Sequence, residues 1–179
     1  MPTIHVDAQV MTELKNRAGR RTPNDLIRQL LNLPVKEELA PVPGVYSIPH
    51  GSKEFKDADK LRLWLAEELA VDGEYSVASS HYWRNVIPGS VCLFHKNKLF
   101  VGEGRMSGGL EPYTGGEASP ETGRSYAGTV HFDPTSIKVY LNPVSFDAAE
   151  RLLGKTLTFR GMQKLTEEDY AKLTKKVCK

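Results

Sequence analysis

The chain has 179 residues, of which 40% are hydrophobic and 26% are charged, and this composition is typical of a globular protein. No apolar run reaches the roughly 20 residues that a membrane-spanning helix needs. The N-terminus lacks the charge and hydropathy pattern of a signal peptide, so we expect a cytoplasmic protein with no membrane partner. The two cysteines, Cys92 and Cys178, are far apart and form no CxxC motif, so they predict neither a disulfide framework nor a zinc site.

The formal net charge of +2 lies entirely in residues 1–33, which hold five basic and three acidic side chains. Residues 3–7 alternate apolar and polar side chains like a short strand, and residues 8–18 and 23–32 carry apolar stripes like two amphipathic helices. Thr22 is placed to cap the second helix. Three such short elements have too few apolar side chains to bury a core alone, so this unit needs a partner, most economically a second copy.

This strand–helix–helix segment, through TIHVDAQVMTELKNRA, the turn GRRT and PNDLIRQLL, resembles the ribbon-helix-helix DNA-binding proteins. The resemblance implies a homodimer whose paired strands enter the major groove of DNA, while the start of the second helix grips a phosphate. Asp7 departs from the family pattern because its carboxylate would repel phosphate, so base readout and dimerisation alone both stay open. The residues assigned to groove and backbone contacts are Thr3, His5, Arg20, Arg21, Thr22 and Asn24.

Residues 34–44 carry three prolines and read as a linker, so we place a second domain at residues 45–179. Its short strands, with helices at both ends, predict the α+β class and a small, strongly curved sheet or barrel. A Gly-rich stretch at 107–123 predicts a mobile loop. Strands are expected at 45–49, 74–83, 90–96, 98–106, 126–132, 137–141 and 155–161, with a tight turn at Asn97. Helices are expected at 53–70, ended by Asp72-Gly73, at 147–153 and from Thr166 to about Val177, where Thr166 and Asp169 cap the last helix.

The stretch WRNVIPGSVCLFHKNKLFVGEGRM (83–106) resembles the EVE and related PUA-like domains. VHFDPTSIKVYLNPVS (130–145) is similar to a strand–turn–strand found in such domains where they form the reader part of modification-dependent restriction systems. The resemblance implies a PUA-like curved β-barrel that recognises a nucleic acid. It also implies an aromatic pocket for a modified base that is flipped out of duplex DNA.

Stacking on a base needs flat apolar faces, and the base edge needs a few polar partners. Tyr82, Trp83 and Tyr113 are the candidate stacking residues, although Tyr82 and Trp83 would serve equally well as core or lid residues. The polar candidates are Ser79, Ser80 and Asn85. Arg105 and Arg124 flank the Gly-rich loop and are candidates for phosphate contacts or for ordinary surface charges.

The sequence contains no complete catalytic motif, and His95 and His131 have no third metal ligand at a recognisable spacing. We therefore expect no enzymatic activity and no cofactor, and cleavage would come from a nuclease domain or subunit outside this chain. The alternative function is a ribbon-helix-helix transcriptional regulator whose C-terminal domain binds a ligand or a partner protein.

Overall fold

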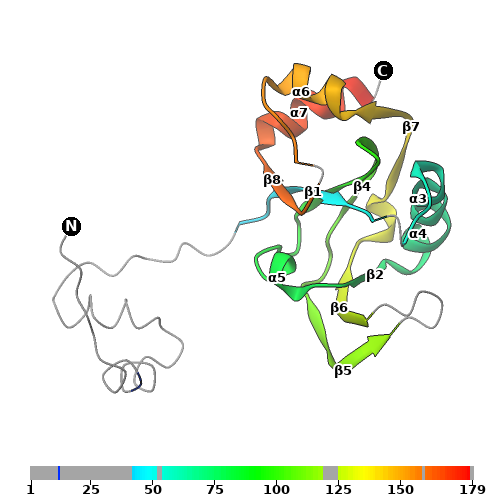
Figure 1. Cartoon of the computed structure of the whole chain (residues 1–179), viewed down its shortest axis with the longest axis vertical. Helices are drawn as coiled ribbons and strands as arrows, with labels where there is room; N and C mark the ends of the chain where they lie inside the picture. The colour runs from blue at the N-terminus through cyan, green and yellow to red at the C-terminus, as the bar shows by residue number, and fades with distance from the viewer. Residues whose placement is uncertain (1–11, 13–41, 52–53, 119–124, 159, 178–179) are drawn as a thin grey trace. The chain divides into compact units, whose positions relative to one another are not determined.

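The computed structural model describes residues 12, 42–51, 54–118, 125–158 and 160–177, without the side chains of 114–118 and 176–177. The chain divides into two units, Met1–Ala40 and Pro41–Lys179. Apart from Thr12, the described residues belong to the second unit (Figure 1). The ribbon-helix-helix segment predicted at 1–33 thus lies outside the described residues and stays a prediction.

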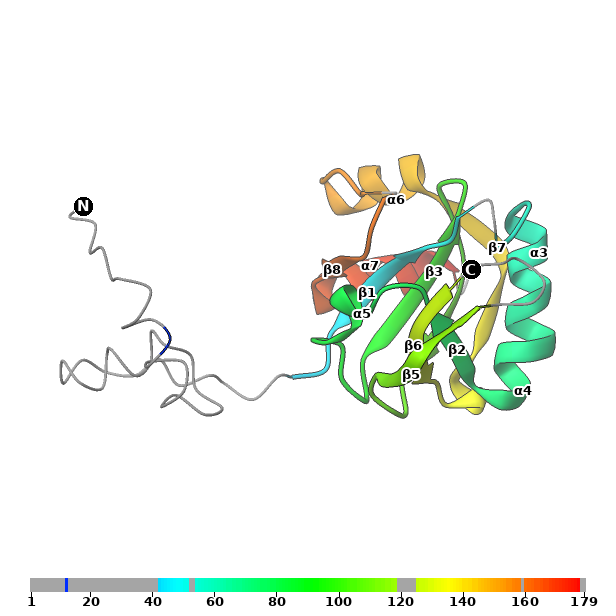
Figure 2. The same ribbon diagram turned by 60° about the horizontal axis from the view of Figure 1, so that its bottom comes forward.

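The strands of the second unit form two sheets, and the predicted α+β class is confirmed (Figure 2). The larger sheet has the order β7-β4-β3-β1-β8, in which only β1 and β3 pair in parallel. The smaller, antiparallel sheet has the order β2-β6-β5. The described strands meet between the sheets at one bridge, Met106 to Phe132, and do not close into a barrel. The strand bounds are β1 Val45–Pro49, β2 Glu74–Val77, β3 Val91–Lys96, β4 Leu99–Arg105, β5 Glu111–Ala118, β6 Ser125–His131, β7 Lys138–Ser145 and β8 Gln163–Leu165.

Helices cover both faces of the larger sheet, and none of the described helices is long and apolar enough to cross a membrane. Helix α3 continues through one π-helical segment into α4, which ends at Gly73 with a left-handed φ of 72°, at the predicted position. Figure 1 shows α6 and α7 together at the opposite end of the unit from β5. The bounds are α3 Ala58–Trp64, the π-helix Leu65–Leu69, α4 Ala70–Asp72, α5 Ser80–Trp83, a 3₁₀ turn Pro134–Ser136, α6 Phe146–Leu153 and α7 Glu167–Val177.

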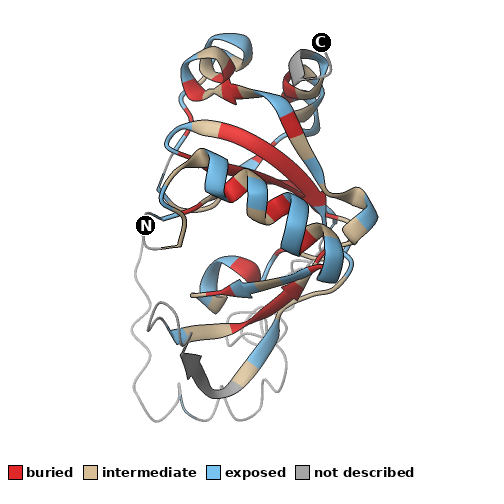
Figure 3. Ribbon diagram, turned by 90° about the vertical axis from the view of Figure 1, so that its right-hand side faces the viewer, coloured by how far each residue is buried: buried red, intermediate tan, exposed pale blue. Residues whose placement is uncertain are grey.

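Alternate side chains of the buried strands fill two hydrophobic cores. On β3, Cys92 and Phe94 face a core shared with helices α3–α4 and the smaller sheet, whereas Val91 and Leu93 face a core under α6 and α7. Figure 3 shows the buried stripe of the α3–α4 helix turned toward the sheets and its exposed stripe turned outward. Both faces of the larger sheet are thus covered, which explains why β3 is a continuous apolar run in the sequence.

Three predicted segments are wrong, and each error has a physical reason. The strand predicted at 74–83 ends at Val77 and is followed by helix α5, which is too short to show helical periodicity in sequence. The loop predicted at 107–123 contains strand β5, because pairing with β6 outweighs its poor strand propensity. At Gly128 on β6, any Cβ would clash with the carbonyl oxygen of Glu111 on β5, so this pairing depends on glycine.

The strand predicted at 155–161 is also absent from its described residues, and β8 follows at Gln163–Leu165 instead. Side chains take the backbone donors that a neighbouring strand would otherwise bind. The Leu157 amide donates to Glu150 Oε1 at 2.8 Å, and the Thr158 amide donates to Gln163 Oε1 at 2.9 Å.

The predicted cap of the C-terminal helix is confirmed and gives a first testable result. The Asp169 amide donates to Thr166 Oγ1 at 3.1 Å, and the Thr166 amide donates to Asp169 Oδ2 at 2.8 Å. Thr166→Ala is expected to lower the free energy of unfolding by about 1 kcal/mol, measured by urea denaturation. Thr156→Ala, at an exposed threonine outside the helix, should change it by less than about 0.5 kcal/mol. Equal losses in the two variants would contradict the capping role.

Candidate functional site

A small cavity, which we call the aromatic cavity, lies where β1, β2, α5 and the segment before β8 meet. Its volume is about 180 Å³. Three aromatic side chains line it, together with Met162 and the polar residues Ser79 and Glu54. The aromatic residues are Tyr75, Tyr82 and Trp83.

Trp83 contributes to this cavity from within the core. Only 5% of the residue is exposed, and it belongs to the core under the α3–α4 helix. Its ring centroid lies 5.4 Å from that of Tyr75, with the two planes tilted by 46°. Tyr75 packs in turn against Trp64, at 5.8 Å between ring centroids. Trp83 therefore holds Tyr75 in place, and this packing role is the alternative that the sequence left open.

Tyr82 is the exposed member of the cavity, with 51% of the residue accessible. Because α5 is helical, Tyr82 and Trp83 both contact the cavity, whereas neighbouring residues of a strand would point to opposite faces. Because Tyr82 is exposed, its substitution can change ligand binding in the cavity with little effect on the free energy of unfolding.

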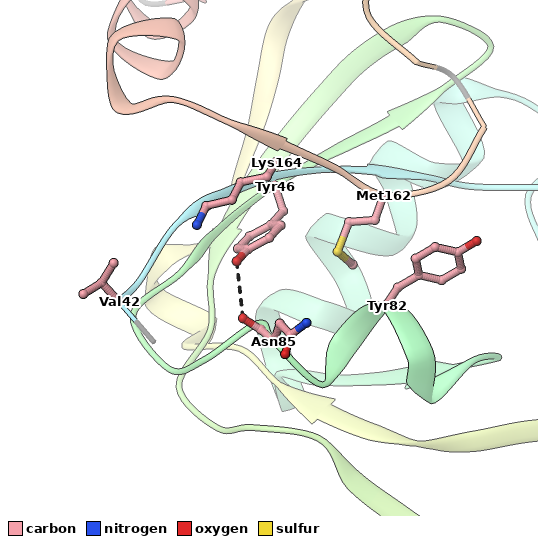
Figure 4. A pocket seen from close by; sticks show the side chains of 6 residues that line it. All are labelled: Val42, Tyr46, Tyr82, Asn85, Met162 and Lys164. Carbon is pink, nitrogen blue, oxygen red and sulfur yellow. Dashed lines mark hydrogen bonds between the residues drawn. The ribbon is translucent and has the colours of Figure 1, made fainter. Parts of the chain in front are cut away.

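Beside the aromatic cavity is a second, more open hollow of about 460 Å³, which we call the tyrosine groove. Figure 4 shows Met162 between Tyr46 and Tyr82, and both Met162 and Tyr82 also line the aromatic cavity. The Tyr46 hydroxyl donates to the backbone carbonyl of Asn85 at 3.3 Å. The Lys164 ammonium lies 5.9 Å from the centroid of the Tyr46 ring, within the range of a cation–π contact. The groove thus presents the ammonium group of Lys164 next to the cavity.

Tyr113 lies apart from the other two predicted stacking residues. Its hydroxyl is hydrogen-bonded to Thr129 Oγ1 and lies 3.5 Å from Ser76 Oγ. Ser76 and Tyr75 are neighbours on β2 and point to opposite faces of the smaller sheet. Tyr113 is therefore on the face away from the aromatic cavity. The third aromatic residue that lines the cavity with Tyr82 and Trp83 is Tyr75.

Of the remaining predicted site residues, some lie at or near the two cavities, Arg105 lies elsewhere, and the others are outside the described part of the chain. Ser79 lines the aromatic cavity and Asn85 lines the tyrosine groove, whereas Ser80 begins helix α5 and lines neither. Arg105 is exposed, and its Nη1 donates to the carbonyl of Gly89 at 2.9 Å. The residues outside the described part of the chain are Thr3, His5, Arg20, Arg21, Thr22, Asn24 and Arg124.

Sequence reasoning missed Tyr75 and His50, which lie side by side in the structure. The Tyr75 hydroxyl is 3.2 Å from Nε2 of His50. Burial, followed by the nearby charges of His95 and Lys96, lowers the pKa of His50 to about 3, so the imidazole is neutral at physiological pH. The alternation in EYSV, which places Tyr75 and Val77 on one face, was the available signal for Tyr75. Among the described residues, no three His, Cys, Asp or Glu side chains are grouped as a metal ion would require.

No family model matches the chain, and no curated protein matches it. Several solved structures resemble it, among them the following two. A hypothetical protein from Leishmania major is 15% identical, with a TM-score of 0.48 over 77% of this chain and 96% of that chain. The NMR structure of Rpa0253 from Rhodopseudomonas palustris is 14% identical, with a TM-score of 0.45 over 75% of this chain and 90% of that chain. At this level of similarity neither structure bears on function, which has to be derived from the site.

Proposed function

We propose that residues 45–179 form a PUA-like reader domain that binds a single nucleobase, flipped out of duplex DNA, in the aromatic cavity. The observation that supports this proposal is the lining of the cavity by Tyr75, Tyr82 and Trp83. Drug-sized ligands occupy pockets of about 300–1,000 Å³. A cavity of about 180 Å³ suits one planar ring system better.

The chemistry of the lining fits a base as well as its size does. Stacking on an aromatic side chain contributes about 1–3 kcal/mol per base, which offsets much of the cost of a few kcal/mol for unstacking it. The Ser79 hydroxyl can donate to or accept from the base edge. The Glu54 carboxylate can accept from the exocyclic amino group of cytosine or adenine. A methyl group on the base adds apolar contact in such a lining, which favours a modified base.

The tyrosine groove supports the proposal because a flipped base remains attached to its strand. Lys164 supplies a positive charge for the backbone beside the cavity. In this proposal residues 1–33 form the ribbon-helix-helix unit that dimerises the protein and brings a second basic segment to the DNA. The chain binds without cleaving, and a separate nuclease domain or subunit would supply cleavage.

The proposal is tested by fluorescence anisotropy with duplexes that carry a methylated cytosine, a methylated adenine or no modification, at two salt concentrations. We expect one modified duplex to bind more tightly than the unmodified one at both salt concentrations. The slope of affinity against salt counts the phosphates that the protein neutralises. It should be the same for modified and unmodified duplexes, because the modification changes the base contact alone.

Equal affinity for all duplexes, unchanged by Tyr82→Ala, would contradict the reader function. If such binding were confined to one palindromic sequence, it would favour the transcriptional regulator instead. Leu141→Ala removes an exposed side chain of β7, which is 88% accessible, and serves as the control substitution away from the cavity.

A further inference from the structure

A third cavity, of about 540 Å³, lies where β1 and β3 end and the turn between β3 and β4 begins. We call it the basic cavity. Asn97 and Lys98 form this turn with left-handed φ angles of 51° and 60°. None of the described acidic residues lines the cavity. Its basic residues are His50, His95, Lys96, Lys98 and Arg160. The two histidines are neutral at physiological pH, because burial lowers the pKa of each.

Lys96 is the unusual residue of the basic cavity, because only 3% of it is exposed. In the parallel pairing of β1 with β3, Pro49 lies opposite His95, so His50 and Lys96 follow side by side at the strand ends. Within the described part of the chain Lys96 forms no ion pair. Lys96 lines the cavity without a counter-ion, so an anion in the cavity would pair with its ammonium group.

Two further polar atoms of the cavity-lining residues are buried and lack hydrogen-bond partners among the described residues. They are Nδ1 of His50 and Nε2 of His95, in residues that are 6% and 2% exposed. Buried polar atoms are nearly always hydrogen-bonded, so a group of unsatisfied ones beside a cavity indicates a missing ligand or solvent. A neutral imidazole can present an N–H to such a ligand.

We propose that the basic cavity is a binding site for a phosphate group. Phosphate oxygens accept hydrogen bonds from ammonium, guanidinium and imidazole donors, and the lining supplies all three. The phosphate would act as the counter-ion of Lys96, with Lys98 and Arg160 at the same cavity.

The position of the cavity indicates where the phosphate comes from. Pro49 and Gly51 line both the basic cavity and the aromatic cavity, so the two cavities adjoin at one short segment. His50 connects them, because it lines the basic cavity while its Nε2 contacts the Tyr75 hydroxyl. A nucleic-acid strand whose base occupies the aromatic cavity could place a phosphate in the basic cavity. This assignment of the source rests on the proposed function, whereas the phosphate site itself does not.

The phosphate site is tested by NMR titration of the full chain with inorganic phosphate, against chloride at the same ionic strength. We expect saturable shifts of the Lys96 and His50 signals with phosphate and none with chloride. Lys98→Gln and Arg160→Gln should each weaken phosphate binding by about tenfold, since each removes a charged donor. Lys175→Gln makes the same charge change on α7 and should alter the affinity by less than about twofold.

The same titration with a nucleoside, its 5′-monophosphate and a short single-stranded oligonucleotide identifies the source of the phosphate. If the strand supplies it, the monophosphate and the oligonucleotide bind more tightly than phosphate, and Tyr82→Ala removes that advantage. If all three phosphate-bearing ligands bind equally, the site takes free phosphate. Lys98 and Arg160 line the cavity but belong to neither hydrophobic core, so their substitution should leave the protein folded. These two variants therefore test the site even if substitution of the buried Lys96 unfolds the protein.

Identical shifts with phosphate and chloride, or a phosphate affinity that neither Lys98→Gln nor Arg160→Gln changes, would overturn the phosphate site. Neither result affects the reader function, which is judged by the preference for a modified base. Conversely, if the protein shows no preference for a modified base but still binds phosphate through Lys98 and Arg160, the phosphate site stands and the reader function is contradicted.

Discussion

Trp83→Ala is expected to lower the free energy of unfolding by about 3–5 kcal/mol, because the substitution empties a core position. The Trp83 residue is 5% exposed and its ring packs against that of Tyr75. Tyr75 also contacts Phe94 and Phe132, with ring centroids 6.2 Å and 6.1 Å away. Loss of the indole therefore loosens a cluster that joins the two sheets. Urea denaturation measures the change.

Tyr82→Ala is the matched substitution for this prediction. Its side chain is about half exposed, so the free energy of unfolding should change by less than about 1 kcal/mol. If the base stacks on Tyr82, the same substitution weakens binding of the modified duplex by about 5- to 150-fold, the equivalent of about 1–3 kcal/mol. Tyr82→Phe keeps the ring and should retain most of the affinity. A Trp83→Ala protein as stable as the wild type would show that the indole is not a core residue.

The correctly predicted elements are those whose signals are local. The apolar run of β3, the turn at Asn97 and the capping residues Thr166 and Asp169 each act within a few positions of the chain. Strand β5 could not be predicted because its residues are poor strand formers. It exists through pairing with β6, which depends on the absence of a side chain at Gly128.

The site was predicted in part for the same reason. Ser79, Tyr82 and Trp83 are close in sequence, and helix α5 keeps them together at one cavity. Met162 comes from a segment far from α5 in the chain, and only the folded arrangement brings it beside that helix. A sequence pattern that indicates a strand or a loop does not show which distant segment packs against it, so the part of the cavity formed by Met162 could not be predicted.

The free energy of unfolding is expected to fall as the pH is lowered from about 6.5 to about 4, because His50 and His95 are buried in the neutral form. Burial, together with nearby positive charge, lowers the pKa of His50 to about 3, and burial lowers the pKa of His95 to about 4. In this pH range the unfolded chain binds a proton at each histidine and the folded chain does not. Protons therefore favour unfolding, and each histidine contributes about 1.4 kcal/mol per pH unit well below pH 6.5.

The Asp169 carboxylate does not explain a loss of stability in this range. Burial alone would raise the pKa of Asp169, but hydrogen bonds from Lys155 and Thr166 lower it overall. Its contribution is thus present above its ordinary value of 3.8 and is lost only as the pH falls further. Urea denaturation at a series of pH values should give a slope that His50→Gln reduces by about half. His81→Gln, at an exposed histidine, should leave the slope unchanged. A slope that is the same in the wild type and His50→Gln would mean that His50 takes up its proton in the folded state, and the burial of its imidazole would then be wrong.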